Sequence, residues 1–124
     1  MEKSDFKKGQ SVFLFRVGDA ARGRETVEDR ILSATVVSVG NKYITVDRGF
    51  SRFVQFEINR NFRQRTDYAA EYELFLSEED VYQSCKRNDM ERTVRRAFDS
   101  YRNVLRDMSF DDLSAIFEIL SKYI

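Results

Sequence analysis

The segment best suited to carry chemistry is a basic, aromatic run between residues 48 and 65. Its sequence, RGFSRFVQFEINRNFRQR, interleaves arginines with phenylalanines and contains a single acid, Glu57. Its candidate binding residues are Arg48, Arg52, Arg60, Phe62, Arg63 and Arg65. Guanidinium groups bind phosphate through paired hydrogen bonds, and exposed rings stack on unpaired bases. The run therefore predicts a contact with a polyanion. The competing interpretation places Phe53 and Phe56 in the core and leaves the arginines as a solvated rim.

Two further arginines lie in a stretch that is rich in turn residues, GDAARGRE, from residue 18 to 25. Its glycines stand five residues apart, as in a phosphate-binding loop. However, Arg24-Glu25 stands where that motif has Lys followed by Ser or Thr, so the motif is not supported. We expect instead a long, mobile loop from Gly18 to Glu28, with Arg22 and Arg24 near its tip, that closes over a partner.

A second basic stripe follows in a segment with helical periodicity. Its members are Arg92, Arg95, Arg96, Arg102 and Arg106. Arginines four residues apart share one side of a helix, and the acids Glu91, Asp99 and Asp107 are near enough in the sequence to pair with several of them. A solvent face laced with salt bridges is one interpretation of this stripe. A docking face for an acidic protein or a nucleic-acid backbone is the other.

The residue types that are missing exclude most catalytic chemistry. The 124 residues include no His, no Trp, no Pro and one Cys, so neither a Ser/His or Cys/His pair nor an imidazole ligand exists. One thiol cannot form an intramolecular disulfide, which suits a reducing compartment. The acids at 78–80 and 111–112 lie at expected helix starts, where capping explains them. We predict a protein that is not an enzyme and has no cofactor and no metal site.

The chain also lacks the patterns of a membrane or exported protein. Its apolar runs fall short of the ~20 residues that a membrane span needs. Its first ten residues, MEKSDFKKGQ, lack the apolar core of a signal peptide. We therefore expect no membrane association and a location in the cytoplasm of a bacterial host cell.

The first half of the chain must position the basic run on β-strands. Short runs of β-branched and aromatic residues alternate there with turn signals. The expected strands are residues 11–17, 30–39, 43–47, 52–58 and 73–76. Gly40-Asn41-Lys42 is expected to form a hairpin turn between the second and third of these. About five short strands joined by tight turns predict a small antiparallel β-barrel, closed or nearly closed, over residues 1–76.

The second half, residues 77–124, has apolar residues at helical spacing. Ser77 with the acids after it, and Ser109 with Asp112, are capping patterns. We expect two or three α-helices, the last two forming a hairpin, which pack on the barrel so that residues 1–124 form one α+β domain. Large apolar residues in the last helix, such as Phe110 and Phe117, leave a homodimer through this helix open.

Charge is divided along the same boundary. Lys plus Arg and Asp plus Glu each total 21, so the formal net charge is zero. Residues 1–70 carry 13 basic against 9 acidic side chains, a balance of +4, and residues 71–124 carry 8 against 12, a balance of −4. The neutral average therefore conceals a mildly basic barrel half and a mildly acidic helical half.

Three short segments carry a resemblance to a known type of barrel. These are Lys8-Gly9-Gln10, ATVVSVG at 34–40 and YITV at 43–46. The barrel half resembles the Src-homology-three-like small barrels, including the KOW type. With YELFLS at 72–77 and the helices that follow, the pattern is similar to that of small phage and mobile-element proteins of Firmicutes. The resemblance covers residues 7–80 and implies a binding module without catalytic residues.

These patterns together predict a phage or mobile-element accessory protein that contacts nucleic acid or a nucleoprotein through an Arg-rich barrel edge. The alternative is an anti-CRISPR-like inhibitor that binds a host defence nuclease and whose acidic helical half mimics nucleic acid. The two hypotheses differ in the partner, which is nucleic acid in the first and a nucleic-acid-binding host protein in the second.

Overall fold

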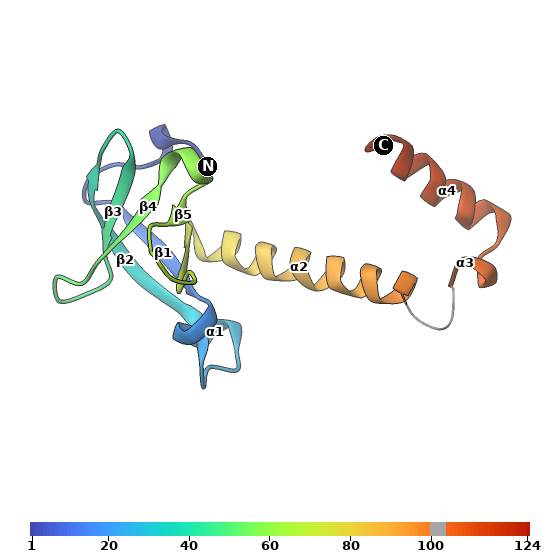
Figure 1. Ribbon diagram of the computed structural model, residues 1–124, viewed down its shortest axis with the longest axis horizontal. Helices are drawn as coiled ribbons and strands as arrows, with labels where there is room; N and C mark the ends of the chain where they lie inside the picture. The colour runs from blue at the N-terminus through green and yellow to red at the C-terminus, as the bar shows by residue number, and fades with distance from the viewer. Residues whose placement is uncertain (100–103) are drawn as a thin grey trace. The chain divides into compact units, whose positions relative to one another are not determined.

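The computed structural model describes residues 1–99 and 104–124 of the chain. It divides into two compact units, residues 1–85 and residues 86–124 (Figure 1). The expectation that 1–124 forms one domain, with the helices packed on the barrel, concerns how the units associate, and it stays a prediction.

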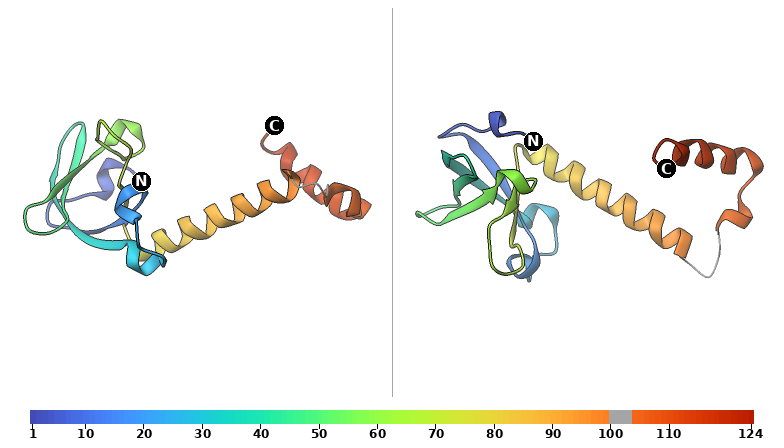
Figure 2. Two further views of the ribbon diagram at one scale, coloured as in Figure 1. Left: turned by 60° about the horizontal axis from the view of Figure 1, so that its bottom comes forward. Right: turned by 45° about the horizontal axis from the view of Figure 1, so that its top comes forward.

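Residues 1–85 contain a six-stranded antiparallel sheet that coils into a nearly closed barrel (Figures 1 and 2). Its strands are β1 (Ser11–Arg16), β2 (Ile31–Val39), β3 (Tyr43–Asp47), β4 (Phe53–Glu57), β5 (Arg63–Gln64) and β6 (Tyr72–Phe75). They follow the order β5-β4-β3-β2-β1-β6. Five of them match the predicted strands to within a residue at each end. The expected count of about five is corrected to six, because β5 has only two residues and is too short to show a hydrophobic period.

Alternation along the strands places the core inside the barrel. On β3 and β4, Ile44, Val46, Val54 and Phe56 are buried, while the residues between them stay at least partly exposed, as a period of two requires. The two interpretations of the phenylalanines are thereby separated. Phe56 is fully buried in the core, whereas Phe53 faces outward with 57% of its surface exposed.

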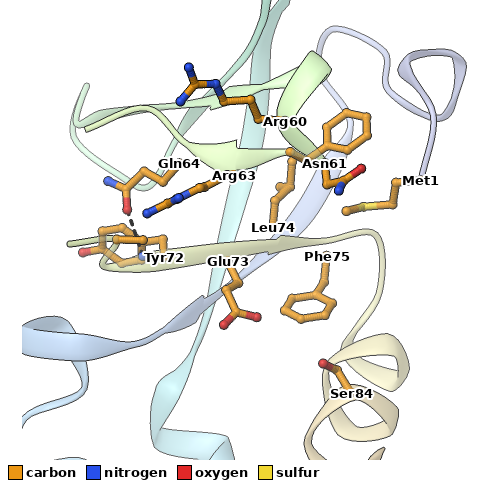
Figure 3. A pocket seen from close by; sticks show the side chains of 12 residues that line it. Met1, Arg60, Asn61, Arg63, Gln64, Tyr72, Glu73, Leu74, Phe75 and Ser84 are labelled. Atoms are coloured by element: carbon orange, nitrogen blue, oxygen red, sulfur yellow. Dashed lines mark hydrogen bonds between the residues drawn. The ribbon is translucent and has the colours of Figure 1, made fainter. Parts of the chain in front are cut away.

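A glutamine side chain closes the gap between the two edge strands of the barrel. Gln64 belongs to β5 and pairs with Phe56 of β4. Its Oε1 accepts a hydrogen bond from the backbone N–H of Tyr72 at 3.0 Å (Figure 3). It accepts a second from the backbone N–H of Glu71 at 2.7 Å. Backbone donors of β6 and of the residue before it are thus satisfied by a side chain of the other edge strand.

The stretch from Gly18 to Glu28, expected to be one long mobile loop, instead contains ordered turns. It holds a 3-10 helix, η2 (Gly18–Ala21), and leads into α1 (Val27–Arg30). The Thr26 hydroxyl caps α1 by accepting from the Asp29 N–H at 3.2 Å. The sequence showed the glycines of this stretch but not the hydrogen bonds that hold its backbone.

Three further helices follow β6, in agreement with the two or three predicted for this half. They are α2 (Glu78–Asp99), α3 (Val104–Asp107) and α4 (Phe110–Ser121). Both predicted caps are present, since Ser77 Oγ accepts from the Asp80 N–H and Ser109 Oγ from the Asp112 N–H, each at 3.1 Å. Within the described residues, none of the helices is sufficiently long and apolar to cross a bilayer.

The first turns of α2 belong to the barrel unit. Val81 is fully buried, and Tyr82 Oη donates a hydrogen bond to Glu28 Oε1 at 3.2 Å. Burial first, and then this contact with Glu28, raises the pKa of the Tyr82 hydroxyl. In the barrel, Phe15 is also buried, although it lies on the face of β1 opposite to the core residues Val12 and Leu14. The start of α2 therefore belongs to the packed part of residues 1–85.

Candidate nucleic-acid interface

A strained turn between β4 and β5 positions the predicted arginines. The 3-10 helix η3 (Ile58–Arg60) is followed by Asn61 and Phe62, which both adopt left-handed backbone conformations with φ of 54° and 60°. Such conformations are uncommon for residues other than glycine, and each costs on the order of 1 kcal/mol. The Phe62 N–H donates to the Glu57 carbonyl at 2.9 Å and holds the turn closed. As a result, the chain reverses between Arg60 and Arg63.

Phe62 itself is a core residue rather than a binding residue. Only 7% of its surface is exposed, and its ring centre lies 5.3 Å from that of Phe6. The sequence singled it out because it stands between arginines, but the left-handed turn directs the ring inward. Since a buried ring offers no free face to a base, Phe62 supports the turn and contributes only to the wall of a neighbouring hollow.

Arg60, Arg63 and Arg65 line one polar hollow of about 290 Å³ at the β4–β5 edge. Two acids, Glu57 and Asp67, line the same hollow. Arg60 Nε lies 3.4 Å from Glu57 Oε2, yet 72% of the arginine side chain remains exposed. The structure therefore brings together the three arginines that follow β4 in the predicted run, with two carboxylates that offset part of their charge.

Arg65 is oriented by its neighbours on the outer face of the sheet. Its Nη1 donates to Gln55 Oε1 at 2.9 Å, and its guanidinium lies 4.8 Å from the centre of the Tyr43 ring. Gln55 Nε2 donates in turn to Thr45 Oγ1 at 3.3 Å. These side chains come from β3, β4 and the end of β5. The alternation of the sheet thus places a hydrogen-bonded row of outward residues beneath the Arg65 guanidinium.

A second, larger hollow of about 480 Å³ adjoins the first, and Arg60, Arg63 and Gln64 line both (Figure 3). Its walls are mainly apolar and include Phe75 of β6, whose ring points toward the start of α2 in Figure 3. Glu73 of β6 also lines it, and desolvation raises the pKa of its carboxyl group above the ordinary value. Two arginines thus stand between a polar hollow and a mainly apolar one.

Other arginines gather near the start of β6. Arg16 Nη1 and Arg24 Nη1 both donate to the Asp29 carbonyl at 3.0 Å, and the Arg48 guanidinium lies 5.7 Å from the centre of the Tyr72 ring. Burial, together with the charges of Arg24 and Arg48, lowers the pKa of Arg16. Arg24 and Arg48 were predicted as binding residues, but Arg16 was not. Its only signal in the sequence is its place as the last residue of an apolar strand.

Two predicted arginines, Arg22 and Arg52, stand apart in exposed turns. Arg22 pairs with Asp19 at 3.0 Å, and both side chains are largely exposed. Arg52 lies in the β3–β4 turn, where its N–H donates to the Gly49 carbonyl at 3.2 Å. Phe50 and Ser51, which lie between Gly49 and Arg52, have left-handed backbones. The Phe50 ring, 95% exposed, is a candidate stacking surface that the predicted set did not include.

The predicted helical stripe is exposed where the structure describes it. Arg92 lies 3.7 Å from Asp89, and Arg95 lies 2.7 Å from Glu91. Arg96 and Arg106 are also exposed, whereas Arg102 lies outside the described residues. The two ion pairs favour the interpretation of this stripe as a salt-bridged solvent face. Across residues 1–99 and 104–124, no group of three or more Cys, Asp or Glu is placed to hold a metal ion.

Comparison with known proteins gives a single finding. The chain matches the family model described as the phage ProQ C-terminal-like domain over residues 1–123. This match supports the expectation of a small phage protein, whereas the Firmicutes origin and the Src-homology-three-like identity stay predictions. No curated protein and no solved structure matches the chain.

Proposed function

The chain belongs to the family of the phage ProQ C-terminal-like domain, and we propose that it is a non-enzymatic phage accessory protein that binds single-stranded nucleic acid at the β4–β5 edge of its barrel. The observation that carries this proposal is the pair of adjoining hollows that share Arg60 and Arg63. A nucleotide has the same two characters side by side, an anionic phosphate and a flat, largely apolar base.

The chemistry of each hollow fits one part of the nucleotide. The polar hollow presents three guanidinium groups, which bind phosphate oxygens through paired hydrogen bonds. The larger hollow offers apolar walls, including Phe75, to a base. A base can enter such a hollow only when it is unpaired and unstacked from its neighbours. The proposed ligand is therefore a single strand rather than a duplex.

The charge of the site sets the strength that we expect. Glu57 and Asp67 line the polar hollow together with the arginines, so only part of its positive charge is available to phosphate. Residues 1–70, which contain all the arginines of the hollow, carry a balance of +4. Because electrostatic attraction supplies most of non-specific nucleic-acid binding, we expect moderate affinity that weakens as salt rises.

The test is a mobility shift with labelled single-stranded RNA and DNA at low salt. Wild type is expected to shift the single strands more strongly than the corresponding duplexes. Arg63→Glu combined with Arg65→Glu is expected to reduce the shift by about tenfold or more, because two phosphate-facing cations become anions. Lys7→Glu combined with Lys8→Glu is the matched control, since it makes the same change of charge at exposed positions that line neither hollow.

The outcomes separate the proposal from its alternatives. Absence of any shift with single-stranded or duplex RNA or DNA would refute nucleic-acid binding. Equal losses in both double variants would show that net charge, and not the β4–β5 edge, controls the interaction. Inhibition of a host defence nuclease stays a prediction, and recovery of one protein partner from nuclease-treated host lysate would favour it.

A further inference from the structure

Residues 86–124 form a unit without a buried core. Where the structure describes this unit, none of its residues is buried. Eleven of its large apolar side chains are at least 39% exposed. These are Met90, Val94, Phe98, Leu105, Phe110, Leu113, Phe117, Ile119, Leu120, Tyr123 and Ile124. Folding must offset conformational entropy by removing apolar surface from water, and a unit of this size does so with difficulty even when it has a core. We therefore expect a partner to cover the exposed apolar surface of this unit.

The helices of this unit form a groove that is lined by apolar atoms. The groove has a volume of about 480 Å³, and side chains of α2, α3 and α4 contribute to it. Val94 and Phe98 line it from α2, Met108 follows α3, and Ile116 and Ile119 line it from α4. No polar surface is exposed in its walls. A groove of this kind accepts an amphipathic helix that lays its apolar side chains into it.

The same unit supplies a helix of the kind that such a groove accepts. On α4, Phe110, Leu113 and Phe117 follow one another at intervals of three and four residues. This is the spacing of the core positions in packed helices. Phe110 and Phe117 are 83% and 69% exposed and do not line the groove of their own copy. Each copy therefore carries one apolar groove and one apolar ridge.

The charges of the two helices also favour pairing between copies. Residues 86–99 of α2 carry five Lys or Arg against three Asp or Glu, a balance of +2. α4 carries three acids, Asp111, Asp112 and Glu118, and neither Lys nor Arg. In a two-fold arrangement, α4 of each copy meets α2 of the other, so that opposite charges face each other twice.

We propose that residues 86–124 are a homodimerisation element in which the α4 ridge of one copy lies in the α2–α4 groove of a second copy. A second copy is the occupant because ridge, groove and complementary charge are present on one chain in equal number, as a self-complementary interface requires. The inference is independent of nucleic-acid binding, since the residues that carry it lie outside the barrel.

The experiment is sedimentation equilibrium of the full chain over a wide range of concentration. Wild type is expected to form a dimer that dissociates on dilution. Leu113→Ala combined with Phe117→Ala is expected to raise the dissociation constant by about tenfold or more, because both apolar anchors are truncated. Alanine is the strongest helix former, so these changes preserve the propensity of α4 to fold. Circular dichroism of both proteins verifies that the helix content is kept.

The matched control is Phe50→Ala combined with Phe53→Ala, which truncates two exposed rings of the barrel. This variant is expected to dimerise as wild type does. The proposal is overturned if wild type is monomeric at every concentration. A chain that stays monomeric and binds only a different protein through this unit overturns it as well. It is also overturned if the α4 variant dimerises as tightly as wild type. Loss of dimer in the α4 variant alone supports it.

Discussion

Arg65 and Arg60 are held in different ways at the β4–β5 edge, and the difference bears on binding. The guanidinium of Arg65 is fixed by Gln55 and by the ring of Tyr43, so it loses little further freedom when it meets an anion. Arg60 has a single exposed ion pair with Glu57. Such pairs contribute about 0–1 kcal/mol, so Arg60 can exchange its carboxylate partner for a phosphate at little cost.

Glu73 gives a pH dependence that can be tested. Desolvation raises the pKa of its carboxyl group above the ordinary, unfolded value, so the folded protein binds more protons than the unfolded chain between these two pKa values. The contribution of Glu73 to the free energy of unfolding therefore falls as pH rises through that window. Glu73→Gln is expected to remove this fall, and urea denaturation at acid and neutral pH measures it. Equal pH dependence in wild type and variant would contradict the assignment.

The residues of the candidate interface were partly predictable from the sequence. Arg60, Arg63 and Arg65 were recognisable because three cations within six residues must lie close together. Phe62 was predicted to bind from its place between arginines, but its burial was not predictable, since its left-handed backbone and its packing against Phe6 depend on the turn that the tertiary structure imposes. Arg16 was missed because its neighbours in space, Arg24 and Arg48, are distant from it in the sequence.

At the scale of elements, closure of the barrel depends on one side chain. Gln64→Ala removes the acceptor of the Glu71 and Tyr72 N–H groups. We expect a loss of about 1 kcal/mol in the free energy of unfolding and faster hydrogen exchange at these two amides. Gln64→Glu is the control, because its carboxylate keeps the acceptor oxygens. Unchanged exchange in Gln64→Ala would show that the barrel closes without this contact.

The attachment of α2 to the barrel unit is expected to depend on Val81. This residue is fully buried, whereas Val94, farther along the same helix, is 54% exposed. Val81→Ala is expected to lower the free energy of unfolding by about 2 kcal/mol, because it removes buried methyl groups and leaves a cavity. Gln83→Ala truncates an exposed side chain of the same helix that does not line the apolar groove, and it is expected to stay within about 0.5 kcal/mol of wild type. Equal effects in chemical denaturation would contradict the burial of Val81.

The elements themselves were predictable wherever a hydrophobic period was long enough to read. Five strands and the capped starts of α2 and α4 were recovered in this way. The two-residue strand β5 and the four-residue helix α1 were not, because elements this short show no period. β5 forms by pairing with β4 across the η3 turn, and α1 is held by its Thr26 cap, so both depend on local turn geometry.

At the scale of the whole molecule, the two units have complementary roles in the proposed account. The barrel unit carries the arginines and the adjoining hollows, and residues 86–124 carry the apolar ridge and groove. The family match extends over residues 1–123, so the helices are part of the family's domain and not an appendage to it. A dimer would present two barrel edges to one strand and raise its apparent affinity without new contacts.

The net charge of zero makes the salt dependence of binding informative, because no large overall charge adds a background attraction. The most direct test of the central claim is the affinity for single-stranded nucleic acid as a function of salt, compared between wild type and Arg63→Gln combined with Arg65→Gln. Each phosphate contact contributes about 0.7 to the slope of log affinity against log salt. We predict a negative slope for wild type that becomes shallower by about 1.4 in the variant. An unchanged slope, or wild-type binding that salt does not weaken, would contradict the account.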